Sequence, residues 1–195
     1  MNDINFESAT LNLEPGIPFA RSYWVVPGKL LAGYYPGDLD TSKMEKKLKG
    51  LLQAGIRYVI NLMDEYEQNW DGKRFRSYED DIKRYAGQEG VEITLVRRPI
   101  EDLSVPTPEY LRNILDEIDN AVSQNRPVYI HCWGGKGRTG TVVGCYLARH
   151  GYAQGENVLD LIHELRQNDP EVYHASPETR QQRDMVTNWQ EGEKQ

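Results

Sequence analysis

Residues 128–140 constrain the fold of this chain more than any other stretch. The stretch begins with a short apolar, β-branched run typical of a buried strand, and residues 141–148 after it are apolar, as in a buried helix. Between these elements lie Gly134, Gly135 and Gly137. Glycine lets backbone N–H groups turn toward one centre, and the helix adds its free N–H groups and positive dipole end. The sequence therefore predicts a strand, a loop that holds a dianion, and a helix.

Cys132 and Arg138 lie at the two ends of this loop, with five residues between them. A thiol is a good nucleophile only when it is ionised, and inward N–H groups, a helix N-terminus and a guanidinium all favour the thiolate. The guanidinium of Arg138 can hold two phosphate oxygens while Cys132 attacks the phosphorus in line. The hydroxyl of Thr139 can donate to the sulfur and help the thiolate leave in a second step. The spacing thus predicts phosphoryl transfer through cysteine.

Two other glycine-rich phosphate loops are excluded by their context. Gly135, Gly137 and Gly140 have the spacing of a dinucleotide-binding loop, but that fold needs a second strand about 20 residues further on, ending in an acidic residue. Residues 155–168 have helical periodicity instead, and no strand pattern follows. A Walker-type loop needs Ser or Thr directly after Gly-Lys, and here Gly137 follows Lys136. Neither type of nucleotide loop is therefore expected.

Composition limits the number of domains and the kinds of partner. A chain of 195 residues with 38% hydrophobic residues can bury one core. We expect an arm over residues 1–19, a single domain over 20–190 and a tail over 191–195. The net charge of −7 argues against nucleic acid and anionic membranes as partners.

Cysteine and histidine usage indicates the compartment and the cofactors. The two cysteines lie in unlike surroundings and predict no disulfide framework, and the four histidines have no metal-ligand spacing. The first residues contain no apolar signal segment. We therefore expect a cytoplasmic monomer that does not insert into membranes and uses no metal or organic cofactor.

Strand and helix patterns alternate along most of the chain. Two short runs on either side of Pro27-Gly28 predict a hairpin at one edge of a sheet. Thr107-Pro108 and Ser176-Pro177 are typical of helix starts. Further strands are predicted over residues 57–63, 91–96 and 127–130. Helices are predicted over residues 41–54, 78–88, 107–123 and 141–148, and two more helices are predicted to begin near residues 155 and 176.

This order favours an α/β fold with a largely parallel central sheet of about five strands and helices on both faces. In such sheets, ligands bind beyond the carboxyl ends of the strands. Asp64, Asp102 and Cys132 all follow predicted strands and fall at such positions. The sheet would therefore bring these three residues to one edge.

Three sequence features each allow two interpretations. Asp64, Glu65 and Glu67 follow a predicted strand, where a solvated turn is favoured and a cleft is the alternative. Cys145 lies in the apolar helix, so a core thiol is favoured over a regulatory disulfide. His131 precedes the nucleophile and points to the opposite side of the strand, which favours a buried hydrogen-bonding brace over an acid or base.

The motif His131-Cys132-x-x-Gly135-x-x-Arg138-Thr139-Gly140 resembles the signature of cysteine-dependent protein tyrosine and dual-specificity phosphatases. Every motif position matches, and the similarity to small bacterial dual-specificity phosphatases extends over roughly residues 23–190. The resemblance implies a protein tyrosine phosphatase-like fold, a phosphocysteine intermediate, and a phosphorylated protein or small phosphoester as substrate. The substrate-binding loop would consist of Trp133, Gly134, Gly135, Lys136, Gly137 and Arg138.

The resemblance also implies a general acid. The family supplies an aspartic acid from a loop upstream of the cysteine, and Asp102 lies about 30 residues before Cys132. Asp102 would protonate the leaving oxygen and later activate the hydrolytic water. Glu101 is the competing carboxylate, and a simple turn residue is the other interpretation of Asp102.

A second candidate for positioning this water lies near the C-terminus. Glu178-Thr179-x-x-Gln182 resembles the glutamine-bearing loop of many tyrosine phosphatases, with Glu178 in place of the first glutamine. Gln182 could take over its role, and a plain helix start is the equally favoured alternative.

Lys136 and Trp133 bear on the class of substrate. Phosphoinositide phosphatases share the loop Cys-x-x-Gly-Lys-Gly-Arg, but they usually carry a second lysine where this chain has Trp133. An aromatic side chain suits a phenol ring, and the sequence has no polybasic run for an anionic membrane. We therefore expect phosphotyrosine-containing protein as substrate, with phosphoserine or phosphothreonine accepted in a shallow pocket. A phosphoinositide or inositol phosphate phosphatase is the alternative. A catalytically inactive phosphate-binding module is less favoured, because Cys132, Arg138 and Asp102 are all present.

Overall fold

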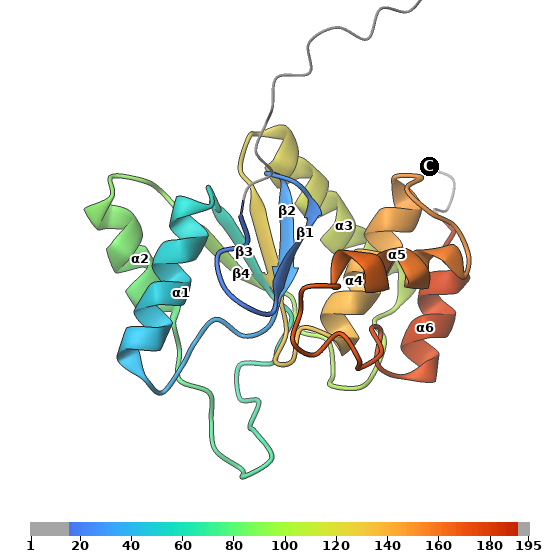
Figure 1. Ribbon diagram of the computed structural model, residues 1–195, viewed down its shortest axis with the longest axis horizontal. Coiled ribbons are helices and arrows are strands. Elements are labelled where there is room, and N and C mark those ends of the chain that lie inside the picture. The colour runs from blue at the N-terminus through green and yellow to red at the C-terminus, as the bar shows by residue number, and fades with distance from the viewer. Residues whose placement is uncertain (1–15, 191–195) are drawn as a thin grey trace, which may run out of the picture.

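The computed structural model describes residues 16–190 (Figure 1). The expected arm over residues 1–19 falls mostly outside this range, and the expected tail over 191–195 falls entirely outside it. A five-stranded sheet in the order β1-β2-β5-β3-β4 forms the centre. Its strands are β1 Ser22–Val26, β2 Leu30–Gly33, β3 Tyr58–Asn61, β4 Thr94–Arg97 and β5 Val128–His131.

The sheet is parallel except at one edge. β1 and β2 form the predicted antiparallel hairpin, while β2, β5, β3 and β4 run in the same direction. β5 is the central strand, and Ile130 pairs with Ala32 on one side and with Ile60 on the other. All four residues of β5 are buried, as expected for a parallel strand with helices over both faces. The carboxyl end of β5 therefore opens at the middle of one edge of the sheet.

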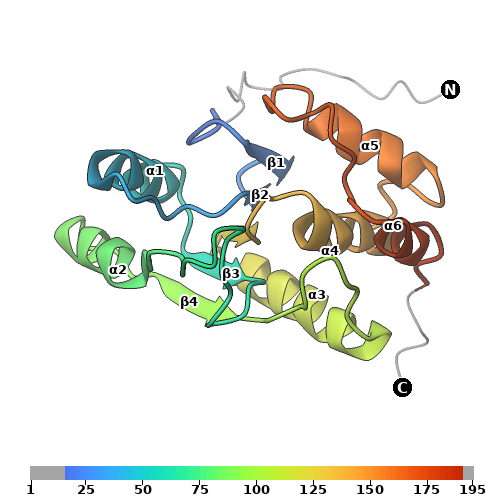
Figure 2. The same ribbon diagram turned by 90° about the horizontal axis from the view of Figure 1, so that it is seen from below.

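Helices lie on both sides of the sheet (Figure 2). Six helices occur among residues 16–190. Helices α1 Thr41–Gln53 and α2 Glu79–Gln88 pack together on one face. The other face carries α3 Pro108–Ser123, α4 Gly137–Arg149, α5 Asn157–Leu165 and α6 Arg180–Thr187, and α6 packs on α4 and α5. The predicted α/β class with a largely parallel sheet is confirmed. No helix among residues 16–190 is long and apolar enough to cross a bilayer.

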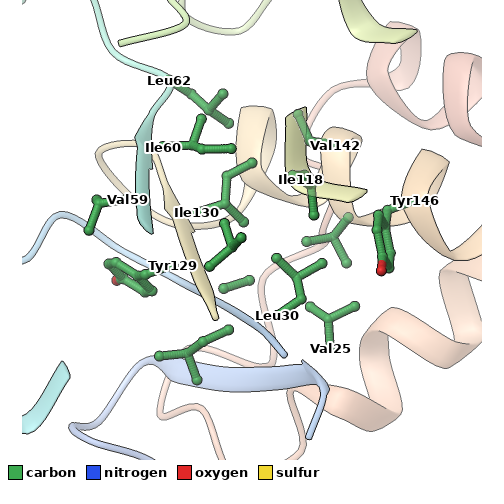
Figure 3. Packing of buried hydrophobic residues seen from close by; sticks show 14 of the residues in the cluster. Val25, Leu30, Val59, Ile60, Leu62, Ile118, Tyr129, Ile130, Val142 and Tyr146 are labelled. Carbon is green, nitrogen blue, oxygen red and sulfur yellow. The ribbon is translucent and has the colours of Figure 1, made fainter. Parts of the chain in front are cut away.

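The side chains of β5 alternate between two apolar layers (Figure 3). Ile130 points toward Ile118 of α3 and Val142 of α4, and Tyr129 points to the opposite side of the sheet. These residues are fully buried, and full burial of one aliphatic side chain contributes about 1.5–3 kcal/mol. The alternation places His131 on the side of Tyr129, with which its ring stacks. The core thus fixes the strand that delivers Cys132.

One helix begins later than the sequence suggests. Ser176-Pro177 predicts a helix start, but α6 begins at Arg180 and Thr179 caps it. The hydroxyl of Ser176 instead donates to the carbonyl oxygen of Lys136, at 2.9 Å. Ser176 therefore does not cap a helix, and its side chain binds the loop before α4 instead. In contrast, Thr107 caps α3 and Pro108 is its first residue, as predicted.

Candidate active site

The loop between β5 and α4 lines a cavity of about 350 Å³. Cys132 lies directly after β5 and is 2% exposed, and Arg138 lies in the first turn of α4 and is also 2% exposed. The cavity is lined by the loop residues Cys132, Trp133, Gly134, Lys136, Gly137 and Arg138 and by Arg21, Tyr34, Trp70, Asp102, Leu103, Glu171 and Glu178. Asp102, which comes from a separate loop earlier in the sequence, therefore meets Cys132 and Arg138 at one cavity.

Two glycines of the loop pack closely against other segments of the chain. Gly135 has φ 72°, and a Cβ there would lie 2.6 Å from the carbonyl carbon of Gly33 and 2.7 Å from the amide nitrogen of Tyr34. Because both neighbours are backbone atoms, neither can yield. A Cβ on Gly137 would lie 3.0 Å from the Glu178 carboxylate and 3.1 Å from the Gln182 amide oxygen. Close packing against β2 and the start of α6 thus gives the loop its shape.

Arg138 is held by three groups around its guanidinium. Glu67 accepts from Nη1 at 2.6 Å and from Nη2 at 2.8 Å, the carbonyl oxygen of Ile100 accepts from Nη1 at 3.2 Å, and Asp102 lies 2.9 Å from Nη2. Nε is buried and has no hydrogen-bond partner among residues 16–190. An anion could therefore bind the edge of the guanidinium formed by Nε and Nη2 if Asp102 moved away from Nη2.

The surroundings of Arg138 keep it charged. Burial opposes the charge, but the hydrogen bond to Glu67 and the field of Cys132 and Asp102 raise the pKa of Arg138 above its ordinary value. Glu67 is only 14% exposed on its side chain. The favoured solvated turn is therefore wrong for Glu67. Asp64 and Glu65 are exposed, and they line a small cavity of about 60 Å³ together with Glu67.

Asp102 and Glu101 differ in their access to the cavity. Asp102 lines the cavity, and its carboxylate is 42% exposed while it contacts Arg138. Glu101 is exposed and does not line the cavity. Of these two carboxylates, Asp102 is therefore the one in position to reach a leaving group there.

His131 is a neutral, hydrogen-bonded core residue. Its Nδ1 lies 3.1 Å from the carbonyl oxygen of Cys132, and its Nε2 lies 2.6 Å from the hydroxyl of Tyr78. A carbonyl only accepts, so Nδ1 carries the proton and the hydroxyl of Tyr78 donates to Nε2. Burial lowers the pKa of His131 to about 3, with the nearby Arg97 and Arg138 acting in the same direction. The ring thus holds the backbone of Cys132 without titrating near neutral pH.

Thr139 lies one residue beyond Arg138 in α4 and is fully buried. Its hydroxyl has no hydrogen-bond partner within the described part of the chain, so no bond to the sulfur of Cys132 is present. The next hydroxyl along the helix, that of Thr141, donates to the carbonyl oxygen of Gly137. The unpaired hydroxyl of Thr139 is available to a thiolate that reorients during reaction.

Lys136 forms an ion pair at the mouth of the cavity. Its Nζ lies 2.9 Å from Glu171, which also pairs with Arg21 at 2.9 Å. Arg21 in turn donates to the carbonyl oxygen of Gly134 at 2.8 Å. Burial opposes the charge of Glu171, but the bonds from Lys136 and Arg21 lower its pKa. The positive charge of Lys136 is therefore largely compensated in the free protein.

Trp133 forms part of an aromatic rim. Its ring lies 5.2 Å from that of Trp70 and 5.3 Å from that of Phe75 between centroids. Trp70 is 83% exposed, yet this contact holds it over the catalytic loop. The sequence indicated Trp133 at the rim but gave no sign of Trp70, which comes from a polar and irregular stretch.

Gln182 is fully buried and connects three segments. Its side-chain oxygen accepts from the amides of Glu178 and Thr179, which completes the capping box of α6. Its amide nitrogen donates to the carbonyl oxygen of Ser104 at 3.0 Å, in the loop that carries Asp102. Both polar ends of Gln182 are therefore occupied by backbone groups in the free protein.

No group of three or more His, Cys, Asp or Glu side chains suited to a metal ion occurs among residues 16–190. A central parallel strand that ends in a buried cysteine, followed by a glycine-rich loop and a buried arginine, defines a phosphatase of the protein tyrosine phosphatase fold. The chain belongs to the PTP-SAK family, described as the DSP-PTPase phosphatase domain of Swiss Army Knife proteins, whose family model matches residues 19–195.

Other known proteins agree with this assignment. The dual specificity protein phosphatase CDC14AB of Danio rerio is 31% identical over 135 residues, which cover 65% of this chain and 19% of that protein. The chain spans between 19% and 43% of the length of the first curated relatives that it matches.

Solved structures share the fold. Tk-PTP in its active form superposes with a TM-score of 0.58 at 24% identity, over 85% of this chain and 93% of that one. The core catalytic domain of the PP-IP phosphatase SIW14 from S. cerevisiae gives 0.62 at 18% identity, over 91% and 90%. At these identities the likeness establishes the fold alone.

Proposed function

We propose that this protein hydrolyses phosphomonoesters through a phosphocysteine intermediate, and that its substrates are phosphotyrosine-containing proteins. The observation that carries the proposal is the buried Arg138 guanidinium, whose Nε has no hydrogen-bond partner in the described part of the chain. Arg138 lines the same cavity as Cys132 and Asp102. A dianion placed on the edge formed by Nε and Nη2 satisfies Nε and leaves Glu67 on the outer pair of N–H groups.

Substrate binding then changes the partner of Asp102. The phosphate replaces the Asp102 carboxylate on Nη2 of Arg138, which frees that carboxyl to face the leaving oxygen. Asp102 must carry a proton at this stage, and it lies at the mouth of the cavity, where the ester oxygen of a bound substrate is expected.

The reaction proceeds in two balanced steps. The sulfur of Cys132 attacks phosphorus, the P–S bond forms and the P–O bond to the leaving group breaks as Asp102 gives its proton to that oxygen. A water molecule then attacks the phosphocysteine, gives a proton to Asp102 and releases inorganic phosphate. The thiolate leaves toward the unpaired hydroxyl of Thr139, while the neutral His131 holds the backbone carbonyl of Cys132.

The charges around the cavity favour a singly phosphorylated aromatic substrate. Lys136 and Arg21 share the carboxylate of Glu171, and Asp102 and Glu178 also line the cavity. The mouth therefore offers little free positive charge to a highly phosphorylated ring. The rings of Trp70 and Trp133 suit stacking on a phenol. A phosphoinositide or inositol phosphate phosphatase is the second candidate, since SIW14 with the same fold is described as a PP-IP phosphatase.

In this proposal residues 20–190 form a single catalytic domain, and the enzyme acts as a monomer. No step uses a metal or an organic cofactor. A cytoplasmic location is part of the proposal, because the thiol of Cys132 must stay reduced. Cys132 and Cys145 are both buried in the structure.

The experiment that tests the chemistry compares Cys132→Ser with Cys145→Ala as the matched cysteine variant. Cys132→Ser should abolish turnover of p-nitrophenyl phosphate and still bind phosphate, because Arg138 and the loop amides remain. Cys145→Ala should keep its activity per folded molecule. Measurable hydrolysis by metal-free Cys132→Ser would exclude the covalent route. An inactive wild-type protein that still bound phosphate would indicate a binding module.

The substrate class is tested by kcat/KM on phosphotyrosyl peptides and on soluble phosphoinositides. We expect the peptides to be preferred. A preference for the inositide that collapses in Lys136→Ala would instead assign Lys136 to a ring phosphate and overturn the protein substrate.

A further inference from the structure

A second cavity of about 370 Å³ adjoins the catalytic cavity. The two cavities share the side chains of Tyr34 and Trp133 as a common wall. The second cavity, here called the flanking cavity, is lined by Tyr34, Tyr35, Gly37, Asp38, Leu39, Lys47, Asn69, Lys73, Arg74, Phe75, Arg76 and Trp133. None of the steps proposed above uses it.

The wall of the flanking cavity has a defined shape. Residues 68–74 form a small hairpin, closed by a bridge between Gln68 and Arg74. The side-chain oxygen of Asn69 accepts from the amides of Asp71 and Lys73 at 3.0 and 2.9 Å. The hydroxyl of Tyr35 then donates to the carbonyl oxygen of Arg76 at 2.8 Å. These bonds hold the cations of residues 73–76 along one side of the cavity.

Lys73, Arg74 and Arg76 carry uncompensated charge. Within the described part of the chain, none of the three lies within ion-pair distance of a carboxylate; Arg74 stacks over the ring of Tyr66, and Arg76 donates to a backbone carbonyl. This contrasts with the catalytic cavity, whose cations are paired with Glu171, Glu67 and Asp102. In a protein of net charge −7, three such cations in four residues create a local positive potential beside the catalytic site.

Aromatic rings form the base of the same cavity. The ring of Phe75 packs at 5.3 Å against Trp133 and at 5.1 Å against Tyr35. Lys47 is almost fully buried there and is satisfied by Asp38, the Tyr34 hydroxyl and the Gly37 carbonyl. An apolar base beside free cations strengthens their attraction for an anion, because the local dielectric is lower than that of water.

We propose that the flanking cavity binds an acidic or phosphorylated side chain that neighbours the phosphotyrosine of a peptide substrate. This inference rests on the proposed function and adds a preference for negatively charged flanking sequence. A peptide carries its charges on separate side chains, about 3.3 Å of backbone per residue apart when extended. Such a chain can place one group on Arg138 and another beyond the wall of Trp133.

The test uses three phosphotyrosyl peptides that differ only at the residues flanking phosphotyrosine: alanine, glutamate or phosphoserine. Exposed ion pairs each contribute a factor of roughly 1.4 to 5 in affinity. We therefore expect kcat/KM for the glutamate and phosphoserine peptides to exceed that for the alanine peptide by about 5-fold. Added salt should reduce this ratio, since the cations at the cavity are solvent-accessible.

Lys73→Glu should bring the ratio close to one and leave the turnover of p-nitrophenyl phosphate unchanged. Lys29→Glu is the matched control, because Lys29 is exposed in the turn before β2, at the opposite end of the sheet from the catalytic loop. It should keep the wild-type ratio.

Four outcomes would overturn the inference. Equal hydrolysis of the three peptides by the wild type, or a ratio that survives in Lys73→Glu as it does in Lys29→Glu, would refute the flanking cavity and leave the proposed function intact. Hydrolysis of p-nitrophenyl phosphate without hydrolysis of any peptide would refute the proposed protein substrate, and the inference with it. A preference for soluble phosphoinositides that is lost in Lys73→Glu would assign the cavity to a ring phosphate.

Discussion

Replacement of Glu67 by glutamine should weaken both catalysis and anion binding. The Glu67 carboxylate accepts from Nη1 and Nη2 of Arg138, and Ile100 is the further acceptor that remains once a substrate phosphate has displaced Asp102. Glutamine keeps one acceptor oxygen, but it brings an NH₂ group toward a cation and removes the negative charge. The guanidinium would then lose the partner that orients its Nε and Nη2 edge toward the phosphate.

The size of the effect follows from the contacts. A hydrogen bond to a charged group contributes about 1.5–3 kcal/mol, and Glu67→Gln removes one such bond to a buried guanidinium. If this energy is realised when the phosphate is bound, kcat/KM should fall about 10- to 150-fold. Glu65→Gln is the matched control, because Glu65 is exposed in the same loop, and it should stay within about twofold of wild type.

Steady-state kinetics with p-nitrophenyl phosphate and inhibition by vanadate measure the effect, and thermal unfolding reports whether the variant is folded. Vanadate should bind more weakly to Glu67→Gln than to wild type. Tighter vanadate binding would mean that Glu67 competes with the phosphate for Arg138, and would refute the assignment of the two guanidinium edges.

Other substitutions test the acid, the loop and the histidine. Asp102→Asn should lower kcat by about 10²–10⁴-fold with substrates that have poor leaving groups, and by less with p-nitrophenyl phosphate. Glu101→Gln should change neither rate. The reverse pattern would identify Glu101 as the general acid. Gly135→Ala should lower the melting temperature and the activity, because its Cβ would lie 2.6 Å from a backbone carbon. Tyr78→Phe should cost about 1–3 kcal/mol in urea unfolding, since Nε2 of His131 loses its donor. The pKa of His131 falls to about 3 on folding. Its contribution to stability is therefore complete above about pH 6.5 and is lost as the pH falls toward 3. The variant His131→Asn should lose less stability than the wild type between pH 7 and pH 5.

The catalytic loop could be predicted from the sequence because its chemistry is local. Cys132, the glycines and Arg138 lie within a few residues of one another, between a strand and a helix whose apolar patterns are unambiguous. The parallel sheet followed from the alternation of elements, and with it the position of the loop at the carboxyl end of β5.

Long-range partners could not be predicted in the same way. Glu67 lies 71 residues before Arg138, and nothing in the sequence separates it from the two exposed acids beside it. Ser176-Pro177 has the same local signature as Thr107-Pro108, yet only Thr107 caps a helix. The hydroxyl of Ser176 bonds to Lys136 instead, and this contact becomes visible only when the chain is folded.

The position of Gln182 has a consequence for the order in which the site is assembled. During synthesis, Asp102, Cys132 and Arg138 leave the ribosome well before residue 182. The loop that carries Asp102 gains its anchor at Ser104 only when Gln182 arrives, and the same side chain packs against Gly137. A nascent chain that ends before α6 therefore contains every reactive group and the bonds of Arg138 to Ile100 and Asp102, but it lacks the anchor at Ser104. The geometry of the site is therefore completed only after α6 has been synthesised.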